Sequence, residues 1–127
     1  FFSVDPIKII CNSIKKKFPH IPIIVFPRNV KKNYIKYILP SVDCISVGDD
    51  ITQKQIDQIQ KQKIIQGNLE PKTLLTGGKK LETEVSKVFE KFSKKPFIFN
   101  LSHGILPKTP VKNVKKLIKL VRNYKKK

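Results

Sequence analysis

Four short apolar runs, each followed by a segment of helical character, constrain the fold of this 127-residue chain more than any other feature. The runs occupy residues 21–26, 43–48, 63–68 and 97–101, and they lack the strict polar–apolar alternation of a strand with one solvated face. Continuous apolar strands that alternate with helices predict a parallel sheet covered by helices. We therefore expect an α/β fold with one leading helix and four strand–helix units.

Local signals predict where the helices lie. Asp5 and Pro6 suit the start of the first helix, as cap and first helical residue, and Thr52 with Gln55 forms a capping box for a later one. Apolar residues recur at helical spacing in three segments: Ile10, Ile14 and Phe18; Leu81, Val85, Val88, Phe89 and Phe92; Val114, Leu117, Ile118, Val121 and Tyr124. Tyr34, Ile35 and Ile38 mark a short helix that is expected to end near Pro40, and Pro71 is expected to open a loop that contains Gly77 and Gly78.

Two parallel architectures fit this order of elements. One is an open, doubly wound sheet, and the other is part of a (β/α)₈ barrel, which takes about 250 residues when complete. Four strand–helix units are half of such a barrel. No G-x-G-x-x-G segment follows the first strand, so a dinucleotide site is not expected.

The net charge of +18 raises the question of nucleic-acid binding. All but two of the 27 basic residues are lysines, the exceptions being Arg28 and Arg122. Phosphate and base recognition generally favours arginine, and these lysines are spread over every expected helix. Even the densest cluster, residues 108–127, reads best as a solvated surface, so nucleic acid is not the expected partner.

The remaining composition narrows the class further. Cys11 and Cys44 are far apart and indicate buried thiols rather than a disulfide framework. No apolar run reaches the roughly 18 residues of a membrane span, and the first residues do not resemble a signal peptide. We expect a cytoplasmic protein. Motifs such as C-x-x-C and H-E-x-x-H are missing from the sequence, so no metal site is expected.

Polar residues follow each expected strand, where parallel α/β enzymes bind their ligands. They are Arg28, Asn29, Asp49, Asp50, Asn68, Glu70 and His103, with Leu69 among them. Asp49 and Asp50 could instead cap the helix at Thr52, and Glu70 could be a turn residue. His103, between Ser102 and Gly104, is the strongest candidate, whereas His20 lies in a connector before a strand and is expected to be structural.

Four segments, in order along the chain, resemble the uroporphyrinogen decarboxylase family. Q-G-N-L-E-P at residues 66–71 is similar to that family's Q-G-N-L-D-P, and F-I-F-N-L-S-H-G-I-L-P at 97–107 is similar to F-I-F-N-L-G-H-G-I-x-P. T-P-V-K-N-V at 109–114 and F-P-H-I-P-I-I-V-F-P-R at 18–28 also resemble family segments. Ser102 and Glu70 depart from the pattern, as do residues 29–32, where the family has a glycine-rich loop.

The resemblance implies that residues 1–127 are the carboxyl-terminal part of a (β/α)₈ barrel, homodimeric when complete. Such enzymes remove CO₂ from the four acetate groups of uroporphyrinogen III without a cofactor and yield coproporphyrinogen III for haem biosynthesis. His103 is implied to bind substrate. The Asp and Arg residues that complete the family's site have no counterpart here, so the chain alone should be inactive. Its open strand edges, at 21–26 and 97–101, should pair with a separate amino-terminal half if there is one.

Two other interpretations stay open at the level of sequence. A corrinoid-linked methyltransferase shares the barrel, but such enzymes generally use a zinc site with His-x-Cys, and His103 is followed by Gly104 and Ile105. A basic, nucleic-acid-binding remnant is the alternative from a different class of protein.

Overall fold

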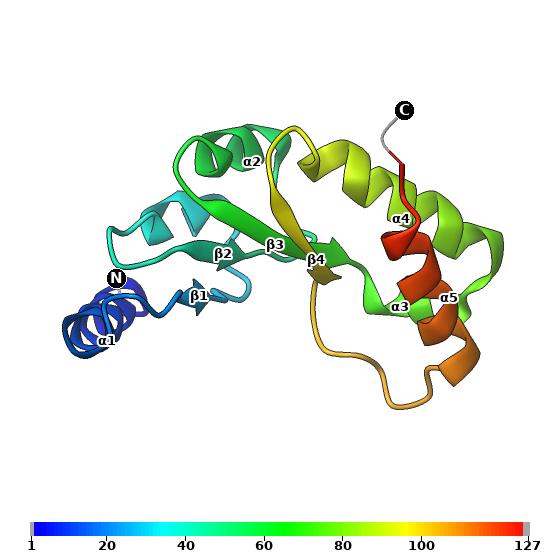
Figure 1. Cartoon of the computed structure of the whole chain (residues 1–127), viewed down its shortest axis with the longest axis horizontal. Helices are drawn as coiled ribbons and strands as arrows, with labels where there is room; N and C mark the ends of the chain where they lie inside the picture. The colour runs from blue at the N-terminus through cyan, green and yellow to red at the C-terminus, as the bar shows by residue number, and fades with distance from the viewer. Residues whose placement is uncertain (1, 126–127) are drawn as a thin grey trace.

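A computed structural model describes residues 2–125 and shows a parallel four-stranded sheet (Figure 1). Its strands are β1 (Ile24–Val25), β2 (Cys44–Ser46), β3 (Ile64–Leu69) and β4 (Phe97–Leu101). They lie side by side in chain order, and every neighbouring pair is parallel. A doubly wound sheet reverses its strand order at a switch point. The order β1-β2-β3-β4 has no such reversal, and it is that of half of a (β/α)₈ barrel.

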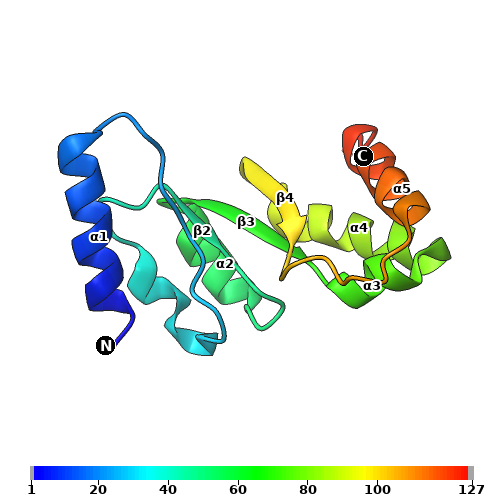
Figure 2. The ribbon, with the colours of Figure 1, turned by 90° about the horizontal axis from the view of Figure 1, so that it is seen from below.

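Helices lie along one side of the sheet; the first precedes β1, the last follows β4, and the others connect the strands. They are α1 (Val4–Lys17), the 3₁₀ helix η1 (Lys31–Tyr37), α2 (Gln53–Gln60), α3 (Pro71–Thr76), α4 (Gly78–Phe92) and α5 (Val111–Arg122). In Figure 1, α2 and α4 lie above the sheet. Figure 2 shows α1 at one end of the molecule and α3, α4 and α5 together at the other.

The two faces of the sheet differ sharply, because successive strand residues point to opposite sides. The helix-covered face is buried and apolar: Val25, Ile45, Val47, Ile65 and Leu69. The opposite face leaves four large apolar side chains 40–47% exposed: Ile24, Phe26, Ile64 and Ile98. We call this second face the inner face, since it corresponds to the interior of a closed barrel.

Two elements differ from the sequence-based expectation. The first strand is only two residues long, because Pro22 and Pro27 flank it and a proline offers no N–H to a neighbouring strand. The expected loop after Pro71 is wrong: residues Pro71–Thr76 form α3, with the proline in its first turn, where the missing N–H costs nothing. Gly77, at φ 69°, then ends this helix.

The first helix begins earlier than expected and packs through a different stripe. Its cap position is Ser3 rather than Asp5, and the Ser3 hydroxyl forms a short hydrogen bond with the hydroxyl of Tyr37. Cys11 is buried against the core, whereas the predicted stripe of Ile10, Ile14 and Phe18 remains exposed. The helix is therefore apolar on more than one side.

The predicted capping box and the predicted burial of both cysteines are confirmed. Thr52 and Gln55 form a complete capping box at the start of α2. Cys11 and Cys44 are free and buried. In the described part of the chain, no helix combines the length and apolar character needed to cross a membrane.

Candidate functional site

His103 lies two residues beyond the carboxyl end of β4 and borders an open cavity of about 580 Å³ on the inner face. Its ring contacts Phe26, with 5.9 Å between the two ring centroids. Its Nδ1 atom is buried, and it has no hydrogen-bond partner among residues 2–125. Buried polar atoms in native proteins generally have a hydrogen-bond partner, so this nitrogen marks a position where a polar group of a ligand or an ordered water would bind.

Ser102 holds the turn that presents His103. Its N–H donates to the carbonyl of Leu69 at 2.8 Å, which extends the pairing of β4 with β3 by one residue. The Ser102 side chain is 1% exposed, and its hydroxyl also lacks a partner within the described chain. Two adjacent buried polar groups beside this cavity therefore lack a partner within residues 2–125.

The cavity combines apolar and polar side chains from all four strands. Ile24 and Phe26 come from the β1 region, Ser46 from β2, Gln66 from β3, and Asn100 to Ile105 from β4 and the turn after it. Gln66 donates to the Ser46 hydroxyl at 3.2 Å and joins two strands across the floor of the cavity. Ser46, Gln66 and Asn100 were not among the predicted site residues. Their position on the inner face would have identified them, but that position follows from the strand register, which the sequence alone does not provide.

One interpretation of the sequence made Asp50 a cap of the helix at Thr52. In the structure Asp50 has a different role, and Thr52 itself is the cap residue. Asp50 Oδ1 accepts from the Tyr34 hydroxyl at 2.5 Å and Asp50 Oδ2 accepts from the Lys31 N–H at 3.0 Å. The Tyr34 hydroxyl also accepts from the Gly48 N–H at 3.0 Å. Burial, followed by the bond to Asp50, raises the pKa of Tyr34 above its usual range, so Tyr34 stays a neutral phenol.

Asn68 joins the same network from β3. Its amide donates to the carbonyl of Gly48 at 2.9 Å. Both main-chain groups of Gly48 are thus held by side chains, from Tyr34 and from Asn68. We conclude that Asp50, Tyr34 and Asn68 stabilise the carboxyl ends of β2 and β3 behind the cavity.

The other polar residues that follow the expected strands are not gathered around His103. Arg28, Asn29, Asp49 and Glu70 are exposed, and none of them borders the cavity. Leu69 is buried on the helix-covered face. Within residues 2–125, no group of three His, Cys, Asp or Glu side chains could hold a metal ion.

A parallel sheet in chain order, helices on one face and a partly polar cavity at the carboxyl ends of the strands define part of a (β/α)-barrel protein. The family model described as "Uroporphyrinogen decarboxylase (URO-D)" matches residues 1–124. The chain belongs to the uroporphyrinogen decarboxylase family.

Individual relatives agree with this assignment and show how much of the family is represented. The chain is 44% identical over 125 residues to a uroporphyrinogen decarboxylase of Orientia tsutsugamushi (strain Boryong). The matched region covers 97% of this chain and 36% of the relative. The chain is 40% identical to one of Rickettsia bellii and 33% identical to one of Paracoccus denitrificans, each with 36% of the relative covered. The chain thus spans little more than a third of the relatives it matches. These matches favour the decarboxylase interpretation over the methyltransferase and nucleic-acid alternatives.

Proposed function

We propose that residues 1–127 form the carboxyl-terminal part of a uroporphyrinogen decarboxylase barrel. The proposed reaction removes CO₂ from the four acetate groups of uroporphyrinogen III and yields coproporphyrinogen III, as a step of haem biosynthesis in the cytoplasm. The observation that carries the proposal is His103, which borders the inner-face cavity with an unpaired ring nitrogen in a chain of this family.

His103 acts in this proposal as a substrate-binding residue. The substrate presents carboxylates on an apolar macrocycle. An imidazole N–H can donate to a carboxylate oxygen, and a charge-assisted bond of this kind is stronger than a neutral one. Phe26, in contact with the His103 ring, supplies an apolar surface for the macrocycle.

The remainder of the barrel is required for activity. The inner face of this chain is open to water, with Ile24 and Ile98 more than 40% exposed. Electrostatic stabilisation of a reacting group is much weaker in water than in an enclosed site. The chain therefore works together with the region of the family that it does not match, in one polypeptide or as two, and the complete barrel forms a homodimer.

A fusion protein tests this function. The part of the Orientia tsutsugamushi enzyme that the chain does not match is joined to residues 1–127, and coproporphyrinogen formation from uroporphyrinogen III is measured after oxidation to the fluorescent porphyrin. We expect turnover by the fusion and none by residues 1–127 alone, with the intact Orientia enzyme as positive control. A folded but inactive fusion, or turnover by the isolated chain, would contradict the proposal.

A further inference from the structure

Ser102 stands where the family pattern has a glycine, and its side chain brings a hydroxyl group to the inner-face cavity. The backbone accommodates a serine here without strain, since Ser102 is not among the described residues with positive φ. The side chain is 1% exposed, and its hydroxyl has no partner within residues 2–125. Burial of an unpartnered hydroxyl costs free energy, so a group outside the described chain is expected to bind it.

The neighbouring His103 Nδ1 atom is in the same state. It is buried, it belongs to a residue that borders the same cavity, and it has no partner among the described residues. The two groups do not bond to each other, because each of them lacks a partner. Both can donate, the hydroxyl through its O–H and the imidazole through an Nδ1–H. A carboxylate has two acceptor oxygens and can therefore satisfy both groups at once.

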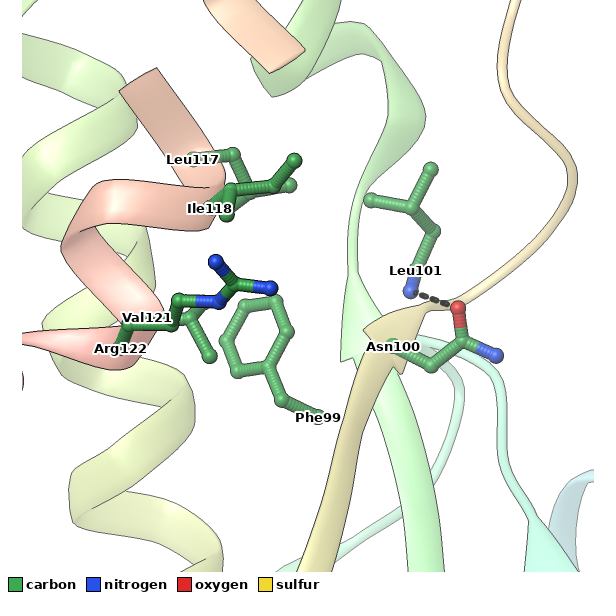
Figure 3. A pocket seen from close by; sticks show the side chains of 7 residues that line it. All are labelled: Phe99, Asn100, Leu101, Leu117, Ile118, Val121 and Arg122. Carbon is green, nitrogen blue, oxygen red and sulfur yellow. Dashed lines mark hydrogen bonds between the residues drawn. The ribbon is translucent and has the colours of Figure 1, made fainter. Parts of the chain in front are cut away.

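Asn100 adds a third donor on the same side of β4. Residues two apart on a strand point to one face, and Asn100 and Ser102 both border the cavity. The Asn100 Oδ1 accepts from the Leu101 N–H at 2.8 Å, and Figure 3 shows the Asn100 side chain pointing away from α5. Its amide nitrogen, a donor, is thus the atom left for a ligand. None of the described residues that border the cavity is acidic, so this part of the cavity favours an anion.

We infer that Ser102 is a substrate-binding residue of this chain. Its hydroxyl and the Nδ1–H of His103 donate to the two oxygens of one substrate carboxylate, and the Asn100 amide lies beside them on the inner face. The ligand class is a carboxylate carried by an apolar macrocycle, and its identity as the porphyrinogen rests on the proposed function.

The carboxylate bound by this pair is one that the reaction leaves on the macrocycle. Loss of CO₂ turns a charged carboxylate into a neutral molecule, and the electrons of the broken bond stay with the macrocycle. Donors aimed at the leaving carboxylate would stabilise the ground state more than the transition state and would slow the step. Coproporphyrinogen keeps the carboxylates of its propionate side chains. A donor pair that holds one of these positions the macrocycle without opposing the reaction.

Porphyrin binding to the fusion protein tests this role without turnover. Uroporphyrin III and coproporphyrin III are the oxidised, unreactive forms of the substrate and the product, and fluorescence quenching follows their binding. Ser102→Ala should weaken the binding of both by about tenfold or more, because a hydrogen bond to a charged group is lost. With uroporphyrinogen III, the same substitution should raise KM by a similar factor and leave kcat unchanged.

Two further variants separate binding from folding. Ser102→Gly removes the same hydroxyl and introduces the residue of the family pattern, so it should behave like Ser102→Ala and replaces it if alanine disturbs the turn. Ser41 provides the matched control, because its hydroxyl is also buried and unpartnered within the described chain but lies outside the cavity. Ser41→Ala should change porphyrin binding less than about twofold.

Unchanged binding in the Ser102 variants would overturn the inference and leave the hydroxyl to an ordered water. Weaker binding of uroporphyrin alone, or a lower kcat at constant KM, would also overturn it, since Ser102 would then act on a leaving carboxylate. A fusion that binds both porphyrins through Ser102 but does not decarboxylate would contradict the proposed function alone. An active fusion whose porphyrin binding is insensitive to Ser102 would contradict this inference alone.

Discussion

The Tyr34 hydroxyl donates to Oδ1 of Asp50 at 2.5 Å, and the same hydroxyl oxygen accepts from the Gly48 N–H. Tyr34→Phe removes both bonds and leaves a buried N–H without a partner. We expect it to lower the free energy of unfolding by about 1–3 kcal/mol in urea denaturation.

The matched control for that substitution is Tyr124→Phe. The Tyr124 ring stacks on Phe89 at 3.7 Å between centroids, and no bond of its hydroxyl is seen among the described residues. Tyr124→Phe should lower the free energy of unfolding by less than about 0.5 kcal/mol. If both substitutions lowered the free energy of unfolding equally, the hydrogen bonds that Tyr34 forms with Asp50 and Gly48 would contribute nothing to stability.

Lys31 is held in a left-handed backbone conformation, with φ 47°. A lysine pays a steric penalty there that glycine does not, and the bond from its N–H to Asp50 does not depend on the side chain. Lys31→Gly should therefore stabilise the chain by about 0.5–1 kcal/mol. Lys32→Gly serves as the control, because Lys32 is not among the residues with positive φ and should gain nothing. Stabilisation of both variants to the same extent would contradict the argument.

Burial, with a smaller contribution from the negative charge of Asp43, raises the pKa of the Cys44 thiol to about 11. At pH 8 only about one molecule in a thousand then carries the reactive thiolate. Burial also raises the pKa of Cys11. The native protein should react slowly with a thiol-specific disulfide reagent at both cysteines, and two equivalents should react at once in guanidinium chloride. Rapid modification of the native protein would contradict the buried placement of both residues.

Asp43 joins α1 to the start of β2. Its Oδ2 lies 2.7 Å from the Lys15 ammonium and accepts from the Ile23 N–H at 2.8 Å. The bond from Lys15, followed by that from Ile23, lowers the pKa of the Asp43 carboxyl. The ionised Asp43 carboxylate therefore stabilises the folded state at pH values above the pKa that Asp43 has in the unfolded chain. This stabilisation is lost as the pH falls through the lower pKa that Asp43 has in the folded chain.

Asp43→Ala should accordingly cost up to about 1 kcal/mol near neutral pH, since both partners are partly exposed. The difference from the unsubstituted protein should shrink toward zero as the solution is acidified below about pH 4. Unfolding free energies measured across this range check the sign. A difference that grows on acidification would exclude the ion pair as its cause.

The strands were predictable because each apolar run is bounded by residues that end strands, such as proline and glycine. The fourth run, which follows Pro96, matches β4 residue for residue. The first run, residues 21–26, forms a strand over only two residues. Strand pairing requires main-chain N–H groups, and Pro22 and Pro27 on either side of the strand have none. The helix α3 was missed because Pro71 and the glycines after it signal a turn, and the same residues also suit the start and end of one short helix.

The site was predictable only in part. A histidine on a turn after the last strand indicates a ligand-binding position, and His103 does border the cavity. The roles of Asp50 and Asn68 depend on Tyr34 and Gly48, which lie 14 to 20 residues away from their partners. Likewise, the exposed stripe of α1 has the same spacing as a buried one, so helical periodicity alone cannot tell which side meets the core.

The most direct test of the central claim is the decarboxylation rate of the fusion protein with and without His103. His103→Ala should lower kcat/KM about 10- to 1,000-fold while leaving the fold intact, because the fusion loses a polar contact to a substrate carboxylate. The other histidine, His20, is exposed in the connector before β1, and His20→Ala should leave the rate unchanged. Equal rates for the His103 and His20 variants would contradict the assignment of His103 to the substrate site.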